Sequence, residues 1–164
     1  AMGPVIRPSA RDRILGYIEK GVAEGAELLL DGRGHSVVGH ENGFFLGPSM
    51  FDRVDPMSTI GREEIFGPVL SMLNVPDLGA AIKLSHSHPQ ANAISIFTTN
   101  GKAARDFSYH APATMVGVNI GVAAPMSFFP FGGAKESFFG DLKAHGRDGV
   151  QFYTDQKVVI ERWF

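Results

Sequence analysis

The order of strand-like and helix-like segments between residues 69 and 119 constrains the fold more than any other feature of the sequence. Three apolar, β-rich stretches alternate there with two stretches that carry helix caps and helical spacing. The expected elements are a strand at 69–75, a helix after a cap at Asp77, a strand at 93–98, a helix at 102–110 after a cap at Asn100, and a strand at 115–119. This order is typical of parallel strands joined by right-handed crossovers. The sequence therefore predicts an α/β fold with a parallel sheet.

The part of the chain before residue 55 predicts one helix followed by short strands. Ser9 follows Pro8 and is a candidate helix cap, and Gly25 is a natural helix stop. Four apolar residues between them fall on one helical face: Ile14, Leu15, Ile18 and Val22. Short strands are expected at 26–30, 37–38, 44–46 and 49–54, with a turn at 31–34.

The C-terminal part of the chain has a different character. Ile120–Gly149 is rich in Gly, Pro and Phe and has no sustained period, which predicts a long loop that is functional or partly disordered. Val150–Trp163 predicts an extended C-terminal strand. The chain shows no internal repeat and no convincing linker, so its 164 residues fit one domain.

Composition excludes several classes of partner. Fifteen basic and 17 acidic residues give a net charge of −2, which offers no reason to expect nucleic acid or an anionic membrane. No run approaches the roughly 18 apolar residues of a membrane span. The first residues also lack the basic start and apolar core of a signal peptide. We expect a cytoplasmic protein, or a mitochondrial-matrix protein in a eukaryote.

The chain contains no cysteine, which excludes a disulfide, a cysteine-ligated metal and a thiolate nucleophile within these residues. None of its six histidines forms a metal-binding spacing, and His86-x-His88 is expected to lie in a surface loop. Gly32-x-Gly34 lacks the third glycine of a dinucleotide-binding motif. Taken alone, the residues contain no complete catalytic constellation.

One segment still carries specific chemistry: Glu63-Glu64-Ile65-Phe66-Gly67-Pro68-Val69. A carboxylate at a strand entrance can accept two hydrogen bonds from a vicinal diol such as a ribose, and a neighbouring phenyl ring can pack against a flat heterocycle. The structural alternative is a helix-ending turn with solvated acids and a phenylalanine in the core. Residue types alone leave both interpretations open.

A second such segment runs from Pro125 to Asp141 and gathers phenylalanines among prolines and glycines. Clustered aromatic side chains of this kind can line a small apolar pocket. The alternative is that the rings bury a long loop against the sheet, which is expected of about half of them even where a pocket exists.

Five motifs in a fixed order link these segments to a known family. They are E-E-I-F-G-P-V at 63–69, G-V-N at 117–119, P-F-G-G-A-K at 130–135, S-F-F-G-D at 137–141 and F-Y-T-x-x-K-V-V at 152–159. Together they resemble the C-terminal part of the aldehyde dehydrogenase superfamily, and the resemblance covers nearly the whole chain from Gly3. The loop at 119–131 resembles most closely the CoA-acylating branch that acts on methylmalonate semialdehyde.

The resemblance implies an NAD-dependent enzyme in which a cysteine attacks the aldehyde and hydride passes to the nicotinamide. In the acylating branch the thioester is released to CoA, so that methylmalonate or malonate semialdehyde gives propionyl-CoA or acetyl-CoA, CO₂ and NADH. The fold implied is the parallel-sheet catalytic subdomain at 3–149 with an extended strand at 150–164 that joins subunits into a homo-oligomer. The NAD-binding domain would precede this chain.

The site residues carried over by the resemblance are few. Glu64 matches the carboxylate that holds the nicotinamide ribose, and Phe66 matches the ring beside the nicotinamide. Asn119 matches a structural asparagine. The substrate tunnel would be bordered by three phenylalanines: Phe128, Phe129 and Phe131.

The missing cysteine is the main departure from the family, because a chain without one cannot form the thiohemiacetal. We therefore expect a C-terminal piece of a longer enzyme that is inactive alone and binds no cofactor. Two alternatives stay open: a piece of a hydrolytic aldehyde dehydrogenase, and a non-catalytic module that uses this fold for subunit interaction.

Overall fold

Helix α1 (Pro8–Ala23) supplies the core of the first of two compact units, which comprise residues 1–76 and 77–164. These assignments come from a computed structural model that describes residues 2–164. Ile14 and Ile18 of α1 are fully buried, whereas Val22, expected on the same face, is 46% exposed. The buried cluster is completed by residues from the loops, strand and short helix that follow: Leu46, Phe51, Val54, Ile60 and Ile65.

The two ends of α1 show how local sequence sets its limits. The N-cap is Arg7 rather than the expected Ser9, because Pro8 takes the first helical position, where its fixed φ and missing N–H cost nothing. The expected stop at Gly25 is confirmed. Gly25 has a φ of +91° and its N–H donates to Val22 O, while the N–H of Ala26 donates to Gly21 O, the hydrogen-bond pattern of a Schellman motif.

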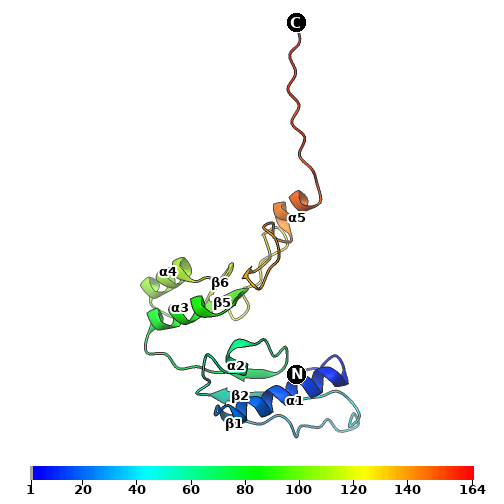
Figure 1. Ribbon diagram of the computed structural model, residues 1–164, viewed down its shortest axis with the longest axis vertical. Coiled ribbons are helices and arrows are strands. Elements are labelled where there is room, and N and C mark those ends of the chain that lie inside the picture. Colours follow the sequence, from blue (N-terminus) through cyan, green and yellow to red (C-terminus); the bar gives the residue numbers. More distant parts are fainter. Residues whose placement is uncertain (1) are drawn as a thin grey trace. The chain divides into compact units, whose positions relative to one another are not determined.

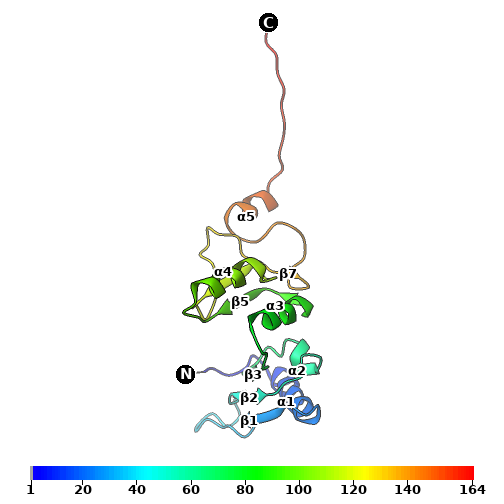
Figure 2. The same ribbon diagram turned by 90° about the vertical axis from the view of Figure 1, so that its left-hand side faces the viewer.

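The sheet of the first unit contains three strands in the order β1-β2-β3 (Figures 1 and 2). Strand β1 (Glu27–Leu30) pairs antiparallel with β2 (Ser49–Asp52), which pairs parallel with β3 (Val69–Ser71). The strands expected at 37–38 and 44–46 are absent. Turns form there instead around Gly39 and Gly43, and Val38 is 93% exposed. The short helix α2 (Thr59–Arg62), capped by the Ser58 side chain, was not expected from the sequence.

The pairing of β3 corrects the expected sheet. We expected the strand at 69–75 to share one sheet with those at 93–98 and 115–119, but β3 belongs to the sheet of the first unit. The α/β class and the parallel pairing of the two later strands are confirmed. Strand β5 (Ala93–Ile96) and strand β6 (Met115–Val118) form a parallel pair, in register from Ala93 opposite Met115 to Ile96 opposite Val118.

Two capped helices accompany this pair in the second unit. Helix α3 (Leu78–Ser87) begins at Asp77, whose carboxylate accepts a hydrogen bond from the N–H of Ala80, as the sequence predicts. Helix α4 (Gly101–His110) begins at Asn100, whose side-chain oxygen accepts from the N–H groups of Lys102 and Ala103. A separate antiparallel ladder joins β4 (Gln90–Ala91) to β7 (Ala134–Lys135).

The end of the chain departs from the expected strand at 150–163. Residues Gly146–Phe152 form helix α5, which begins after His145 in the left-handed region, with a φ of +69°. Beyond it, residues 154–164 have neither helical nor strand pairing and leave α5 as an extended segment (Figure 1). Four of its apolar side chains are between 64% and 93% exposed: Val158, Val159, Ile160 and Trp163. No helix among residues 2–164 has the length and apolar character needed to span a bilayer.

The turn at 31–34 gives a test of the first unit. The Gly32 N–H donates to Ser49 Oγ at 3.0 Å, and Gly32 O accepts from the N–H of Gly47 at 3.0 Å. A Cβ atom on Gly32 would collide with Gly47 O and lie 2.7 Å from Pro48 O, both rigid backbone atoms, whereas Gly34 has open space.

We therefore expect Gly32→Ala to lower the free energy of unfolding by about 3 kcal/mol, the upper range of overpacking costs. The matched control Gly34→Ala should change it by less than about 0.5 kcal/mol, as at an unconstrained surface position. Urea unfolding followed by circular dichroism measures both. Equal stabilities for the two variants would show that the contact with residues 47 and 48 is not maintained.

Candidate functional site

The segment 63–68 lies between α2 and β3 and is fixed by polar contacts from α1 and its C-cap. The Glu24 carboxylate accepts from Thr59 N at 2.7 Å and from Thr59 Oγ1 at 2.6 Å, which satisfies the start of α2. The Tyr17 hydroxyl donates to Glu63 Oε2 at 2.6 Å. That hydrogen bond to Glu63, followed by desolvation, raises the pKa of Tyr17 above its ordinary value of 10.0. Both ends of α2 are therefore tied to the α1 region.

Two adjacent residues of this segment, Ile65 and Phe66, differ sharply in burial. Ile65 is 7% exposed and belongs to the core cluster, whereas Phe66 is 80% exposed with a φ of +55°. A phenylalanine in the left-handed region is uncommon, and such strain concentrates at functional positions. Gly67 then packs so closely on Ile14 that a Cβ atom would lie 2.5 Å from the Ile14 Cδ1 atom. The structural alternative, in which Phe66 fills the core, is thus wrong.

Glu64 immediately precedes the buried Ile65 and is exposed. Glu63 accepts a hydrogen bond from Tyr17, so the two adjacent carboxylates have different surroundings. An exposed carboxylate beside an outward-facing phenyl ring can accept hydrogen bonds from a diol while the ring covers a planar group. The exposure of Glu64 and Phe66 is therefore compatible with the role that the sequence predicts for them, and that role stays a prediction.

Asn119 has the structural role expected of it. It follows β6 with a φ of +56°, and its side-chain amide pairs with the backbone of Thr98: Nδ2 donates to Thr98 O at 3.0 Å and Oδ1 accepts from Thr98 N at 2.8 Å. Its own N–H donates to Ile96 O at 2.8 Å. Asn119 thereby extends the β5–β6 ladder by one step and fixes the start of the aromatic loop, defined here as residues 120–131.

The phenylalanines of the aromatic loop are not buried against a sheet. Phe128, Phe129 and Phe131 are 64%, 54% and 39% exposed, and the rings of Phe128 and Phe129 lie 4.6 Å apart between centroids. The backbone of Phe131 exchanges two hydrogen bonds with Ala144, of 2.7 and 2.9 Å. The structure thus presents the three rings at the surface of the second unit, in keeping with a wall for a ligand, a role that stays a prediction.

The polar groups that hold the base of this loop were missed by the sequence analysis. The Thr114 hydroxyl donates to Gly132 O, and Lys143 Nζ donates to Gly133 O at 2.8 Å while lying 4.1 Å from the Phe138 ring centroid. Lys135 Nζ reaches the carbonyl groups at the end of α3. A lysine in the left-handed region, with a φ of +52°, gives no recognisable local sequence signal beyond the two glycines that precede it.

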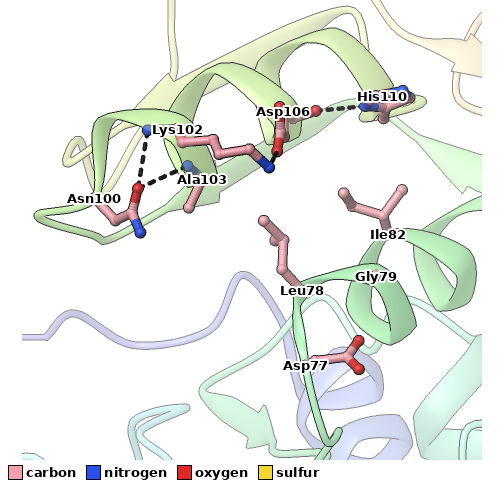
Figure 3. A pocket seen from close by; sticks show the side chains of 9 residues that line it. All are labelled: Asp77, Leu78, Gly79, Ile82, Asn100, Lys102, Ala103, Asp106 and His110. Atoms are coloured by element: carbon pink, nitrogen blue, oxygen red, sulfur yellow. Dashed lines mark hydrogen bonds and ion pairs between the residues drawn. The ribbon is translucent and has the colours of Figure 1, made fainter.

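A groove of about 430 Å³ lies between α3 and α4, and none of the expected site residues lines it (Figure 3). Leu78 and Ile82 of α3 point from one side toward α4. The polar residues of its rim already have partners: Asp77 and Asn100 cap the two helices, and Lys102 pairs with Asp106 at 3.0 Å. Within residues 2–164, no three acidic or histidine side chains come together as a metal site would require.

Comparison with known proteins places this geometry in a family. The sequence matches the aldehyde dehydrogenase family over residues 1–159, and the chain belongs to that family. It is 52% identical over 162 residues to malonate-semialdehyde dehydrogenase of Pseudomonas aeruginosa and 53% identical over 163 residues to malonate-semialdehyde dehydrogenase 2 of Shouchella clausii. Each alignment covers 99% of this chain and 33% of the relative, so the chain spans about a third of their length.

Solved structures agree. A Sinorhizobium meliloti protein assigned as a methylmalonate-semialdehyde dehydrogenase, in complex with NAD, superposes with a TM-score of 0.96 at 42% identity, covering 99% of this chain and 33% of that one. The methylmalonate-semialdehyde dehydrogenase of Oceanimonas doudoroffii gives 0.95 at 45% identity, covering 98% and 33%. The α/β fold of this chain is therefore that of part of an aldehyde dehydrogenase, as the sequence motifs predict.

The Tyr17–Glu63 contact can be tested by titration. Because the pKa of Tyr17 is raised, its hydrogen bond contributes stability below pH 10.0 that is lost as the pH rises through the folded-state pKa. We expect Glu63→Gln to move the Tyr17 transition to lower pH, since a neutral amide no longer disfavours the phenolate. Ultraviolet absorbance of the phenolate follows the change.

Tyr17→Phe should remove that transition, and Tyr109→Phe should leave it in place. An unchanged Tyr17 transition in Glu63→Gln would mean that the two side chains are not in contact in solution.

Proposed function

We propose that the chain is the C-terminal third of an NAD-dependent, CoA-acylating methylmalonate- or malonate-semialdehyde dehydrogenase. The reaction would convert the semialdehyde, CoA and NAD into acyl-CoA, CO₂ and NADH. The observation that carries this proposal is the 52% identity, over 99% of the chain, to an enzyme named malonate-semialdehyde dehydrogenase. The likeness in fold to a relative in complex with NAD supports the cofactor.

Within this enzyme, Glu64 and Phe66 would contact the nicotinamide end of NAD. The segment fits that group, because Phe66 is exposed in the left-handed region and the exposed Glu64 lies two residues before it, with the buried Ile65 between them. When bound, NAD supplies the hydride acceptor. The carboxylate of Glu64 would orient the ribose through charge-assisted hydrogen bonds, and the Phe66 ring would cover one side of the nicotinamide.

The aromatic loop would border the path of the aldehyde. Phe128, Phe129 and Phe131 present apolar surface that is exposed in this chain, and exposed apolar groups of this extent are typical of binding surfaces. They would exclude water from the reacting carbonyl and would not transfer protons. The nucleophilic cysteine must come from outside these residues, because the chain has none, so this segment would be inactive by itself.

Two alternatives predict different products. A hydrolytic aldehyde dehydrogenase would release a free acid without CoA, and a non-catalytic interaction module would release neither. The names of the relatives favour the semialdehyde substrate. The incubation described next distinguishes CoA from water as the acceptor of the acyl group. The cytoplasmic location expected from the sequence stays a prediction.

The test uses the full-length protein that carries this segment. Incubation with malonate semialdehyde and NAD should give NADH and, with CoA present, acetyl-CoA detected by mass spectrometry. Formation of free acid at the same rate with and without CoA would favour the hydrolytic alternative. No NADH under either condition would contradict the enzyme proposal.

Glu64→Gln in the same protein tests the cofactor site. We expect hydride transfer to slow by a factor equivalent to about 1–3 kcal/mol, the usual worth of a hydrogen bond to a charged group, with the pH profile little altered. The matched control is Glu19→Gln, an exposed carboxylate on α1 outside the segment 63–68, which should leave turnover unchanged. Wild-type turnover and NAD affinity in Glu64→Gln would overturn the assignment.

We also propose that residues 150–164 join subunits into a homo-oligomer. Residues 154–164 carry backbone groups without strand pairing and expose Val158, Val159 and Trp163, which makes them a template for pairing with another chain. Removal of the residues after Thr154 should shift the assembly toward monomers in analytical ultracentrifugation. Replacing Arg147 on α5 with Ala serves as a control outside the tail, and an unchanged mass for the truncated protein would refute the proposal.

A further inference from the structure

The ammonium group of Lys135 binds the C-terminal end of a helix about fifty residues earlier in the chain. Its Nζ atom donates to His86 O at 2.6 Å, to His88 O at 2.9 Å and to Ser85 O at 3.4 Å. Ser85 and His86 belong to the last turn of α3 and His88 is its C-cap residue; at this end the helix supplies no N–H partner and carries the negative end of its dipole. All three donors of the ammonium group are therefore directed at acceptors that need them.

Lys135 sits in a segment whose regular pairing is very short. The ladder between β4 and β7 joins only Gln90 with Lys135 and Ala91 with Ala134. Around it, Glu136 N donates to Pro89 O at 3.1 Å and Ala91 N donates to Ser137 Oγ at 3.0 Å. A two-residue ladder is weak alone, and the charged contact from Lys135 joins residues 134–137 directly to the end of α3.

The same segment determines where the aromatic loop ends. Phe131 lies four residues before Lys135, and the intervening Gly132 and Gly133 are buried and crowded by Phe138 and Ser137. The rings of Phe128, Phe129 and Phe131 are too exposed for core packing to fix them. Their position therefore depends on backbone anchors: Asn119 at the start of the loop, the Phe131–Ala144 pair, and the contacts of Gly132, Gly133 and Lys135 at its finish.

We propose that Lys135 is a positioning residue for the aromatic loop. By binding the carbonyl groups at the end of α3, it keeps Phe128, Phe129 and Phe131 in place for the aldehyde. This inference rests on the proposed function, since it requires those rings to contact the substrate. Lys135 itself would touch neither aldehyde nor NAD. It would therefore affect the apparent affinity for the semialdehyde and leave that for NAD unchanged.

The experiment compares three variants of the full-length protein. In Lys135→Met, the KM for the semialdehyde should rise about tenfold, as expected for the loss of one charge-assisted contact, with the KM for NAD unchanged. Lys135→Arg should restore most of the affinity, because a guanidinium group also donates to several carbonyl groups. Lys102→Met is the matched control, since Lys102 is an exposed helical lysine that pairs with Asp106 on its own helix.

Hydrogen exchange without substrate gives a second readout. Peptides covering residues 120–137 should exchange faster in Lys135→Met than in the wild type, and Lys102→Met should match the wild type. If Lys135→Met does not fold, Lys135→Gln is judged by the same criteria. Faster exchange with an unchanged semialdehyde KM, or equal effects on both KM values, would overturn the positioning role. A wild-type protein without semialdehyde activity would instead overturn the proposed function on which that role rests.

Discussion

The contact between Ile14 and Gly67 determines how the first unit presents its candidate cofactor residues. Ile14 is fully buried, and Gly67 packs against it at a distance that leaves no room for a side chain. The chain must therefore pass α1 closely at this point, with Ile65 on the core side and Phe66 on the opposite side in the left-handed region. The apolar core and the exposed ring are thus two consequences of one close approach.

In the second unit, polar contacts rather than apolar burial determine how the candidate site residues are presented. Its strands are short, and its long loop contributes little to a core. Instead, the Asn119 side chain prolongs the β5–β6 ladder. Lys135 donates to carbonyl groups at the end of α3, and Lys143 donates to the carbonyl group of Gly133 just before β7. Groups of this kind fix a loop in space while leaving its aromatic side chains free, an arrangement suited to a binding surface.

Most features decided by neighbours in sequence were predictable, although the cap expected at Ser9 is Arg7. The caps at Asp77 and Asn100 and the stop at Gly25 depend on side chains or backbone freedom within a few residues, and all three are confirmed. Features decided across long separations were not. The parallel partner of β3 is β2, about twenty residues earlier, and nothing in the apolar run at 69–75 distinguishes that partner from β5. The Lys135 contacts likewise join residues 47 to 50 positions apart.

The candidate site residues illustrate the same division. Motif order identified the aldehyde dehydrogenase family and singled out Glu64, Phe66 and the three phenylalanines of the aromatic loop, whereas residue types alone allowed Phe66 to be a core residue. The structure separates these possibilities because burial is a property of the whole fold: Phe66 is 80% exposed although its neighbour Ile65 is 7% exposed. The Phe66 ring, on a residue in the left-handed region, gains little from the core of its own unit. An exposed aromatic side chain on a strained backbone is typical of a surface that meets a ligand or further protein, and this agrees with a chain that spans a third of the length of its relatives.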